Sequence, residues 1–165
     1  MTPGNFEKFL PRLSSYGVRY ILIGGGAGIA QGLARATYDV DIVYDRSPDN
    51  MAKLIEALAD LHLYFRGAPP GLPFLWDVAF LQSGLNFTLT SDWGDIDLLG
   101  EVAGEGTYAK LISHCDQFEL YGHDIDVVSL KKLIELKRAA GRPKDFEVIA
   151  ELEALQQERH DNPAS

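Results

Sequence analysis

The stretch YILIGGGAGIAQGLARATYDVDIVY, residues 20–44, is the part of the sequence that decides the fold. It opens with residues 20–23, an aromatic and aliphatic run that is typical of a buried strand. Gly24, Gly25 and Gly26 follow where this strand has to turn. Residues 27–33 are mostly small and can form a short helix packed close to the strand.

Two aspartates stand at the start of the second strand of this stretch. Successive strand residues point to opposite faces, so Asp39 and Asp41 share one face while Val40 and Ile42 share the other. Neighbouring carboxylates repel each other unless a cation lies between them. The spacing therefore predicts a metal site.

The glycines also allow a competing interpretation as a dinucleotide-binding turn. No register of residues 24–32 completes G-x-G-x-x-G or G-x-G-x-x-A, because Ile29 or Gln31 stands where the third small residue belongs. A plain glycine-rich turn followed by a solvated strand end is the remaining alternative.

Apolar periodicity continues on both sides of this stretch. Further helices are expected over residues 5–15, 48–62, 105–113, 130–141 and 142–156. Strands are expected over 117–121 and 124–128, and in a hairpin of 85–92 and 95–102 with Trp93 and Gly94 at its tip. Ser47 and Ser129 can cap the helices that they precede. The order of elements predicts an α/β (α+β) fold, a mixed sheet covered by helices.

The segment between residues 66 and 84 is rich in proline and glycine, so we expect an irregular loop. Such a loop either lies over the substrate or simply connects surface elements.

Length and charge narrow the classes of function. The 165 residues suffice for one domain with a sizeable core, and we expect residues 1–165 to form a single unit. A formal net charge of −9 argues against a broad nucleic-acid-binding surface, without excluding a local basic patch. This charge suits a cationic small-molecule acceptor or a basic protein partner.

The distribution of cysteines and apolar residues indicates the compartment. Cys115 is the single cysteine, so no internal disulfide can form, and a cytoplasmic location is expected. No apolar run is long enough for a signal peptide or a membrane span, so no membrane partner is expected.

A longer pattern, GG-x-A-x-x-x-x-G-x-x-R-x-T-x-D-x-D, adds Arg35 and Thr37 to the glycines and the acids. The pattern resembles the nucleotidyltransferases of the DNA polymerase β-like superfamily, in particular the small bacterial branch related to abortive-infection-type toxins. Compared with the pattern of that family, Ala27 stands one place later, and Gly26 stands where a larger apolar residue or a serine is usual. The similarity covers about residues 18–155 and leaves a polar tail after about residue 156.

The resemblance implies a nucleotidyltransferase fold with a Mg²⁺ or Mn²⁺ site. Asp39 and Asp41 would hold the metal ion that carries the triphosphate. Asp97, in a matching Ile-Asp-Leu-Leu segment, would hold a catalytic metal and accept the acceptor's proton. Asp95 lies on the same face as a rival or a helper. The pair Asp124 and Asp126 repeats the spacing, and a solvated strand edge is its favoured interpretation.

The resemblance also suggests which groups would bind the triphosphate. Backbone N–H groups around the three glycines would contact the phosphates. Arg35 and Thr37 belong to the same motif. Residues 129–145 resemble the last motif of these enzymes, in which Lys137 and Lys144 would face the nucleotide. Asp145 would do so too, or serve only as a favourable charge at a helix start.

Two functions of different classes follow. The first is an enzyme that moves a nucleoside monophosphate from an NTP to a hydroxyl of an RNA end, a protein or a small molecule. One form of this hypothesis makes the enzyme a component of a toxin–antitoxin system, with an antitoxin protein as its partner. The second is a non-catalytic nucleotide-binding or partner-binding protein with the same fold.

Overall fold

The computed structural model describes residues 4–102 and 106–162. Its centre is a seven-stranded mixed sheet in the order β3-β4-β5-β2-β1-β9-β8. These strands are β1 (Tyr20–Ile23), β2 (Val40–Tyr44), β3 (Tyr64–Phe65), β4 (Asn86–Ser91), β5 (Gly94–Leu99), β8 (Cys115–Leu120) and β9 (His123–Val128). A separate two-stranded ribbon consists of β6 (Glu101–Val102) and β7 (Gly106–Thr107).

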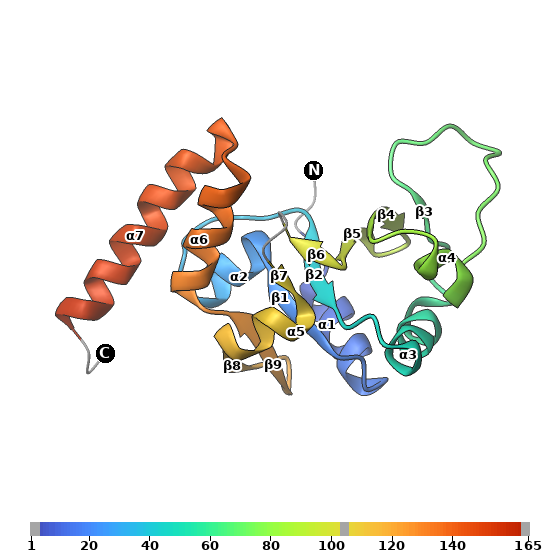
Figure 1. Ribbon diagram of the computed structural model, residues 1–165, viewed down its shortest axis with the longest axis horizontal. Coiled ribbons are helices and arrows are strands. Elements are labelled where there is room, and N and C mark those ends of the chain that lie inside the picture. The colour runs from blue at the N-terminus through green and yellow to red at the C-terminus, as the bar shows by residue number, and fades with distance from the viewer. Residues whose placement is uncertain (1–3, 103–105, 163–165) are drawn as a thin grey trace.

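The helices are α1 (Phe6–Ser15), α2 (Gly24–Ala30), α3 (Pro48–Leu58), α4 (Val78–Gln82), α5 (Tyr108–Leu111), α6 (Leu130–Ala140) and α7 (Phe146–Asp161). Two short 3₁₀ turns, Ile112–His114 and Pro143–Asp145, precede β8 and α7. Helices α6 and α7 form one end of the molecule, and the loop after β3 reaches out at the other (Figure 1). The mixed sheet with helices around it confirms the predicted fold class.

Strand pairing places the acids in the middle of the sheet. Strands β1 and β2 are antiparallel, whereas β2 and β5 run parallel with Asp41 opposite Asp97. The predicted hairpin is confirmed as β4 and β5, with Asp92 and Trp93 at its tip, one residue earlier than expected.

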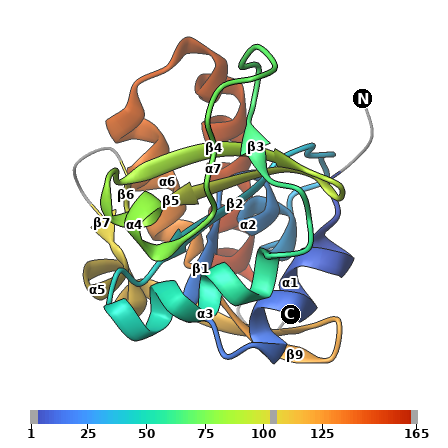
Figure 2. The ribbon, with the colours of Figure 1, turned by 90° about the vertical axis from the view of Figure 1, so that its right-hand side faces the viewer.

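The two faces of the sheet have different surroundings. Tyr20 and Leu22 point to one face, where the hydroxyl of Tyr20 donates to the carbonyl of Leu10 in α1. Helix α3 packs beside α1 below the hairpin (Figure 2). Asp41 and Asp97 point to the opposite face, where they line a cavity together with residues of α6. The apolar face is therefore sealed by two helices, while the acidic face borders a cavity.

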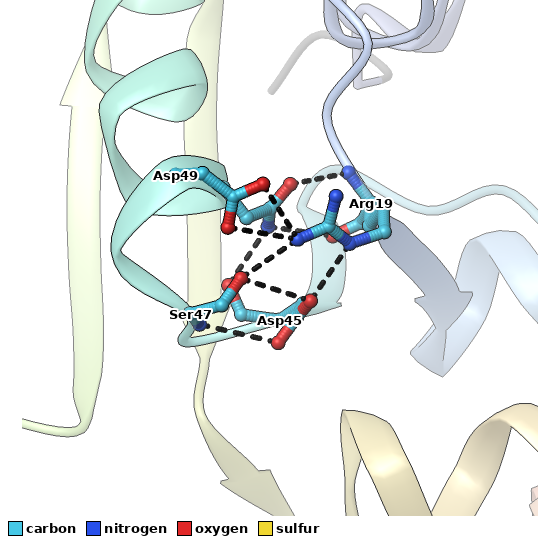
Figure 3. Close-up of polar contacts among 5 residues, drawn as sticks. Arg19, Asp45, Ser47 and Asp49 are labelled. Atoms are coloured by element: carbon cyan, nitrogen blue, oxygen red, sulfur yellow. Dashed lines mark hydrogen bonds and ion pairs between the residues drawn. The ribbon is translucent and has the colours of Figure 1, made fainter.

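A polar network fixes the start of β1 against the end of β2 and the start of α3 (Figure 3). The guanidinium of Arg19 binds Asp45 at 2.8 Å and the Ser47 hydroxyl at 2.7 Å. The buried amide of Asn50 accepts from the backbone N–H of Arg19 and donates to the carbonyls of Arg19 and Asp45. Ser47 precedes α3 as expected, but its hydroxyl donates to Asp45 and makes no capping bond within the helix.

Several helix boundaries differ from the expected ones. Helix α2 begins three residues earlier than expected, α3 ends at Leu58, and α7 continues through Asp161. The region 66–84 is not wholly irregular, because Asp77 accepts from the N–H of Phe80 and caps the short α4. The helix expected over 105–113 is a short strand followed by α5 and a 3₁₀ turn, and Glu105 lies outside the described residues.

Helix α6 has the expected ends. The Ser129 side chain accepts from the N–H of Lys132, and Gly141 terminates the helix with a left-handed φ of 64°. Within the described ranges, none of the helices has both the length and the apolar character needed to cross a membrane.

Candidate active site

Four aspartates gather where β2 and β5 lie side by side. Asp41 and Asp97 are in register on the two strands, Asp95 lies two residues before Asp97, and Asp39 immediately precedes β2. Because alternate strand residues share a face, the sheet brings these carboxylates to one surface. Parallel pairing thus unites acids that are more than fifty residues apart in the chain.

Arg66, the residue after β3, lies among these acids. Its Nη2 donates to Asp97 Oδ1 at 2.7 Å and to the Leu89 carbonyl at 2.8 Å. Its Nε lies 3.1 Å from Asp95 Oδ2 without hydrogen-bond geometry, and its Nη1 lies 3.9 Å from Asp39 Oδ2. Arg66 was not expected at this site from the sequence. The available signal was electrostatic, since clustered acids need a counter-charge, but nothing local identified which cation supplies it.

Asp41 lies on β2 beside Asp97 and Gly24. Burial, followed by the charge and hydrogen bonding of Asp97 and the charge of Asp39, raises the pKa of Asp41 to about 8, while the charge of Arg66 opposes the rise. Its Oδ1 is buried and has no hydrogen-bond partner among the described residues. Among the described residues no cation forms an ion pair with Asp41, although the charge of Arg66 acts on it from a longer distance.

The three glycines allow close contacts at the start of α2. A Cβ at Gly24 would lie 2.3 Å from Asp41 Oδ2, and one at Gly25 would lie 2.6 Å from Thr37 Oγ1. A Cβ at Gly26 would lie 2.5 Å from the Phe6 ring, which explains why no larger residue stands there. The glycines thus let the loop pack directly against the acidic strand and α1.

A cavity of about 340 Å³ opens beside Asp41 and Asp97. Its apolar wall includes Ile23, Leu99, Leu133, Leu136 and Ala140. Two cations, Lys137 and Arg142, line the same space. The cavity therefore combines an acidic floor, an apolar side and a cationic rim.

A buried carboxylate orients both cations. Asp145 accepts from Arg142 Nε at 2.7 Å and from Lys137 Nζ at 3.5 Å, and its side chain is only 6% exposed. Burial alone would raise the pKa of Asp145, but the hydrogen bond from Arg142 and the charge of Lys137 outweigh it and hold the pKa below its usual range. Asp145 is thus the anchor of an ion triad, rather than only a charge at a helix start.

Several solved structures are similar to this arrangement of elements. The lincosamide antibiotic adenylyltransferase LnuA, solved with lincomycin bound, is similar with a TM-score of 0.61 and 17% identity over 93% of this chain and 99% of LnuA. The chain has the nucleotidyltransferase fold.

Two further structures share it. TM1012 of Thermotoga maritima, a candidate nucleotidyltransferase, is similar with a TM-score of 0.58 and 16% identity over 88% of each chain. The antibiotic-resistance factor ANT(2'')-Ia is similar with a TM-score of 0.55 and 14% identity over 96% of this chain and 91% of that one. No protein-family model matches the sequence, and no curated protein matches it significantly.

Not all motif residues of this nucleotidyltransferase fold lie at the cavity. Arg35 binds Glu151 at 2.8 Å and Glu147 at 3.1 Å, so its side chain is turned toward α7. Thr37 packs against Gly25 at the base of the site. Lys144 is exposed and is not among the described residues that line the cavity. The last motif thus places Lys137 and Arg142 at the site.

Asp124 and Asp126 belong to a different part of the nucleotidyltransferase fold. They lie on β9 and line a separate depression of about 200 Å³ together with Arg19 and Tyr108. These acids thus lie away from those of β2 and β5, but β9 is an inner strand between β1 and β8, with Asp124 exposed and Asp126 half-buried, so the expected solvated strand edge is not what the sheet shows.

The donor set of the site is suited to a hard divalent cation. Carboxylate oxygens are the ligands that Mg²⁺ prefers, and the unpartnered oxygen of Asp41 is available for one. As they stand, the described side chains include no group of three His, Cys, Asp or Glu residues arranged to hold a metal ion. The guanidinium of Arg66 lies among the acids instead.

Proposed function

We propose that this chain is a metal-dependent nucleotidyltransferase, which transfers a nucleoside monophosphate from an NTP to an acceptor hydroxyl. The observation that carries the proposal is the register of Asp41 and Asp97 on the floor of a cavity whose rim holds Lys137 and Arg142. Acids and cations at one cavity match a substrate that brings both a metal ion and phosphates.

The reaction requires one bond to form and one to break. The acceptor oxygen attacks the α-phosphorus of the NTP, a new O–P bond forms, and the bond to the β-phosphate oxygen breaks to release pyrophosphate. The proton of the acceptor hydroxyl passes to the carboxylate of Asp97. Lys137 and Arg142, held by Asp145, would bind the negatively charged phosphates.

Asp39, Asp41 and Asp97 are the residues that would hold the metal ion. Bound Mg²⁺ or Mn²⁺ would neutralise the phosphate charge that develops in the transition state. Gly24 lines the cavity, so backbone N–H groups of Gly24, Gly25 and Gly26 at the start of α2 would contact the triphosphate. Thr37, which packs against Gly25, would support the start of α2, and Arg35 would tie the segment before β2 to α7. Lys144 would add a more distant positive charge.

The acceptor would be a small molecule, a protein or an RNA end. A small molecule is the first choice, because LnuA is an antibiotic adenylyltransferase and the formal charge of −9 favours a cationic acceptor. If the acceptor is a protein or an RNA, the enzyme would act as a toxin–antitoxin component, with an antitoxin partner in the cytoplasm.

The test uses each of the four α-³²P-labelled NTPs with Mg²⁺, first with cell extract and then with separated RNA, protein and small-molecule fractions. Transfer of label to one fraction supports the enzyme and identifies its acceptor class. The matched control is Asp97→Asn, which retains the shape of the side chain but removes the carboxylate. Binding of NTP without labelling of any fraction would favour the non-catalytic alternative.

A further inference from the structure

Arg66 is anchored so that its side chain can move while its backbone stays in place. Its backbone N–H donates to the carbonyl of Thr88 at 3.1 Å, which continues the pairing of β3 with β4. Only the guanidinium enters the acidic site, through the long flexible stem of the side chain. A change of rotamer could therefore remove the charge from the acids without disturbing the sheet.

The contacts of this guanidinium coincide with the expected metal ligands. It binds Asp97 Oδ1 at 2.7 Å and approaches Asp39 Oδ2 to 3.9 Å, while Asp95 Oδ2 lies 3.1 Å from Nε. The side chains of Arg66 and Asp97 are 25% and 22% exposed, so solvent screens this ion pair only in part. A carboxylate oxygen engaged by a guanidinium cannot at the same time bind a metal ion in the same direction.

We propose that Arg66 is an internal counter-ion of the acidic site, which competes with the divalent metal ion for Asp97. This inference rests on the metal site of the proposed function. In the metal-free protein Arg66 neutralises part of the repulsion among the four acids. When a metal ion binds, the guanidinium releases Asp97, and the metal affinity is reduced by the free energy of that contact.

Two opposite effects of removing Arg66 follow. The metal-free protein should lose stability, because the acids lose their counter-charge. Metal affinity should increase, because no bond has to be broken before the ion binds. A residue with a purely structural role would produce the first effect without the second.

The experiment compares the full-length parent, Arg66→Gln and Arg66→Lys by titration with MnCl₂ alone, in which the electron paramagnetic resonance signal reports free Mn²⁺. The matched control is Arg138→Gln, which removes the same charge from an exposed ion pair with Glu153 between α6 and α7. This control corrects for the general attraction of a more negative protein for cations.

We expect Arg66→Gln to bind Mn²⁺ about tenfold more tightly than the parent, since charge-assisted hydrogen bonds are among the stronger ones. Arg66→Lys should fall between the two, because an ammonium group retains the charge but not the forked contact. Arg138→Gln should match the parent within about twofold. Equal Mn²⁺ affinity of the parent and Arg66→Gln would overturn the competition.

Thermal melting provides the second readout and also shows whether each variant is folded. In chelator Arg66→Gln should melt below the parent, and saturating Mn²⁺ should raise its melting temperature by more than that of the parent. Failure of Mn²⁺ to bind or stabilise any of these proteins would overturn the metal site, and this inference with it. Metal binding without competition would overturn the inference alone and leave the proposed function standing.

Discussion

Asp41 and Asp97 lie opposite each other on the adjacent parallel strands β2 and β5. This register brings a carboxylate with one buried oxygen, that of Asp41, and the partly exposed carboxylate of Asp97 to the same cavity. The contact is the structural basis for assigning both acids to one site, and it leads directly to the first prediction.

The substitution Asp97→Asn should reduce nucleotide transfer by roughly a thousandfold or more, because metal stabilisation of the transition state is worth several kcal/mol. The carboxamide retains the shape of the side chain but neither holds a metal ion tightly nor accepts a proton. Single-turnover transfer assays measure the loss. Relief of repulsion with Asp41 and loss of the charged bond to Arg66 act in opposite directions on stability. We therefore expect the melting temperature to change by a few degrees at most.

If Asp97→Asn retains the activity of the parent, the proton acceptor is another group. Asp95, two residues earlier in β5 and 3.1 Å from Arg66, is then the residue to change next.

Gly24 should tolerate no side chain. Its φ is 66°, and a Cβ would lie 2.3 Å from Asp41 Oδ2, so Gly24→Ala combines backbone strain with a clash at the site. Gly122→Ala is the matched control, because Gly122 has a φ of 81° but open space around it. We expect Gly122→Ala to cost roughly 1 kcal/mol and Gly24→Ala at least twice as much. Chemical denaturation measures the free energy of unfolding of both variants. Equal losses would show that Asp41 and its strand shift readily to make room for the added methyl group.

Lys137 and Lys144 should behave differently. Lys137 lines the cavity, so Lys137→Gln should raise the KM for the NTP by about tenfold with a smaller change in kcat. Lys144 is exposed, and Lys144→Gln should change the KM by about twofold or less. Steady-state kinetics with the accepted NTP make the comparison. The reverse order of effects would mean that the 3₁₀ turn Pro143–Asp145 rearranges when nucleotide binds.

Asp41 should make the metal-free protein pH-sensitive. The pKa of Asp41 is about 8 in the folded protein, above the ordinary value of about 4 for an unfolded chain. The folded state therefore retains a proton that the unfolded state loses between these values. The contribution of Asp41 to stability is full below about pH 4 and is lost as the pH rises through about 8.

The variant Asp41→Asn isolates this contribution, because its carboxamide stays neutral. We expect the melting temperature of the parent in chelator, minus that of the variant, to fall between about pH 5 and about pH 9. Asp39, Asp97 and Arg66 face Asp41 in both proteins. A constant difference over this range would show that Asp41 is ionised throughout.

The sequence by itself determined the central strands and the acids on one of their faces. Residues 20–44 encode them locally, because strand propensity, the glycine turn and two-residue alternation act over neighbouring positions. The β4–β5 hairpin and both ends of α6 were predictable for the same reason, since a turn and a cap are short-range features. The family pattern added Asp97 and Lys137 as candidates.

Only the tertiary structure decided which distant groups meet. Arg66 among the acids and Arg35 turned toward α7 depend on contacts between segments that no local pattern relates. Helix α4 and the early start of α2 were missed because packing against neighbouring elements outweighs weak helix propensity. Alternation assigns a side chain to a face of a strand, but strand order and register decide what lies opposite it.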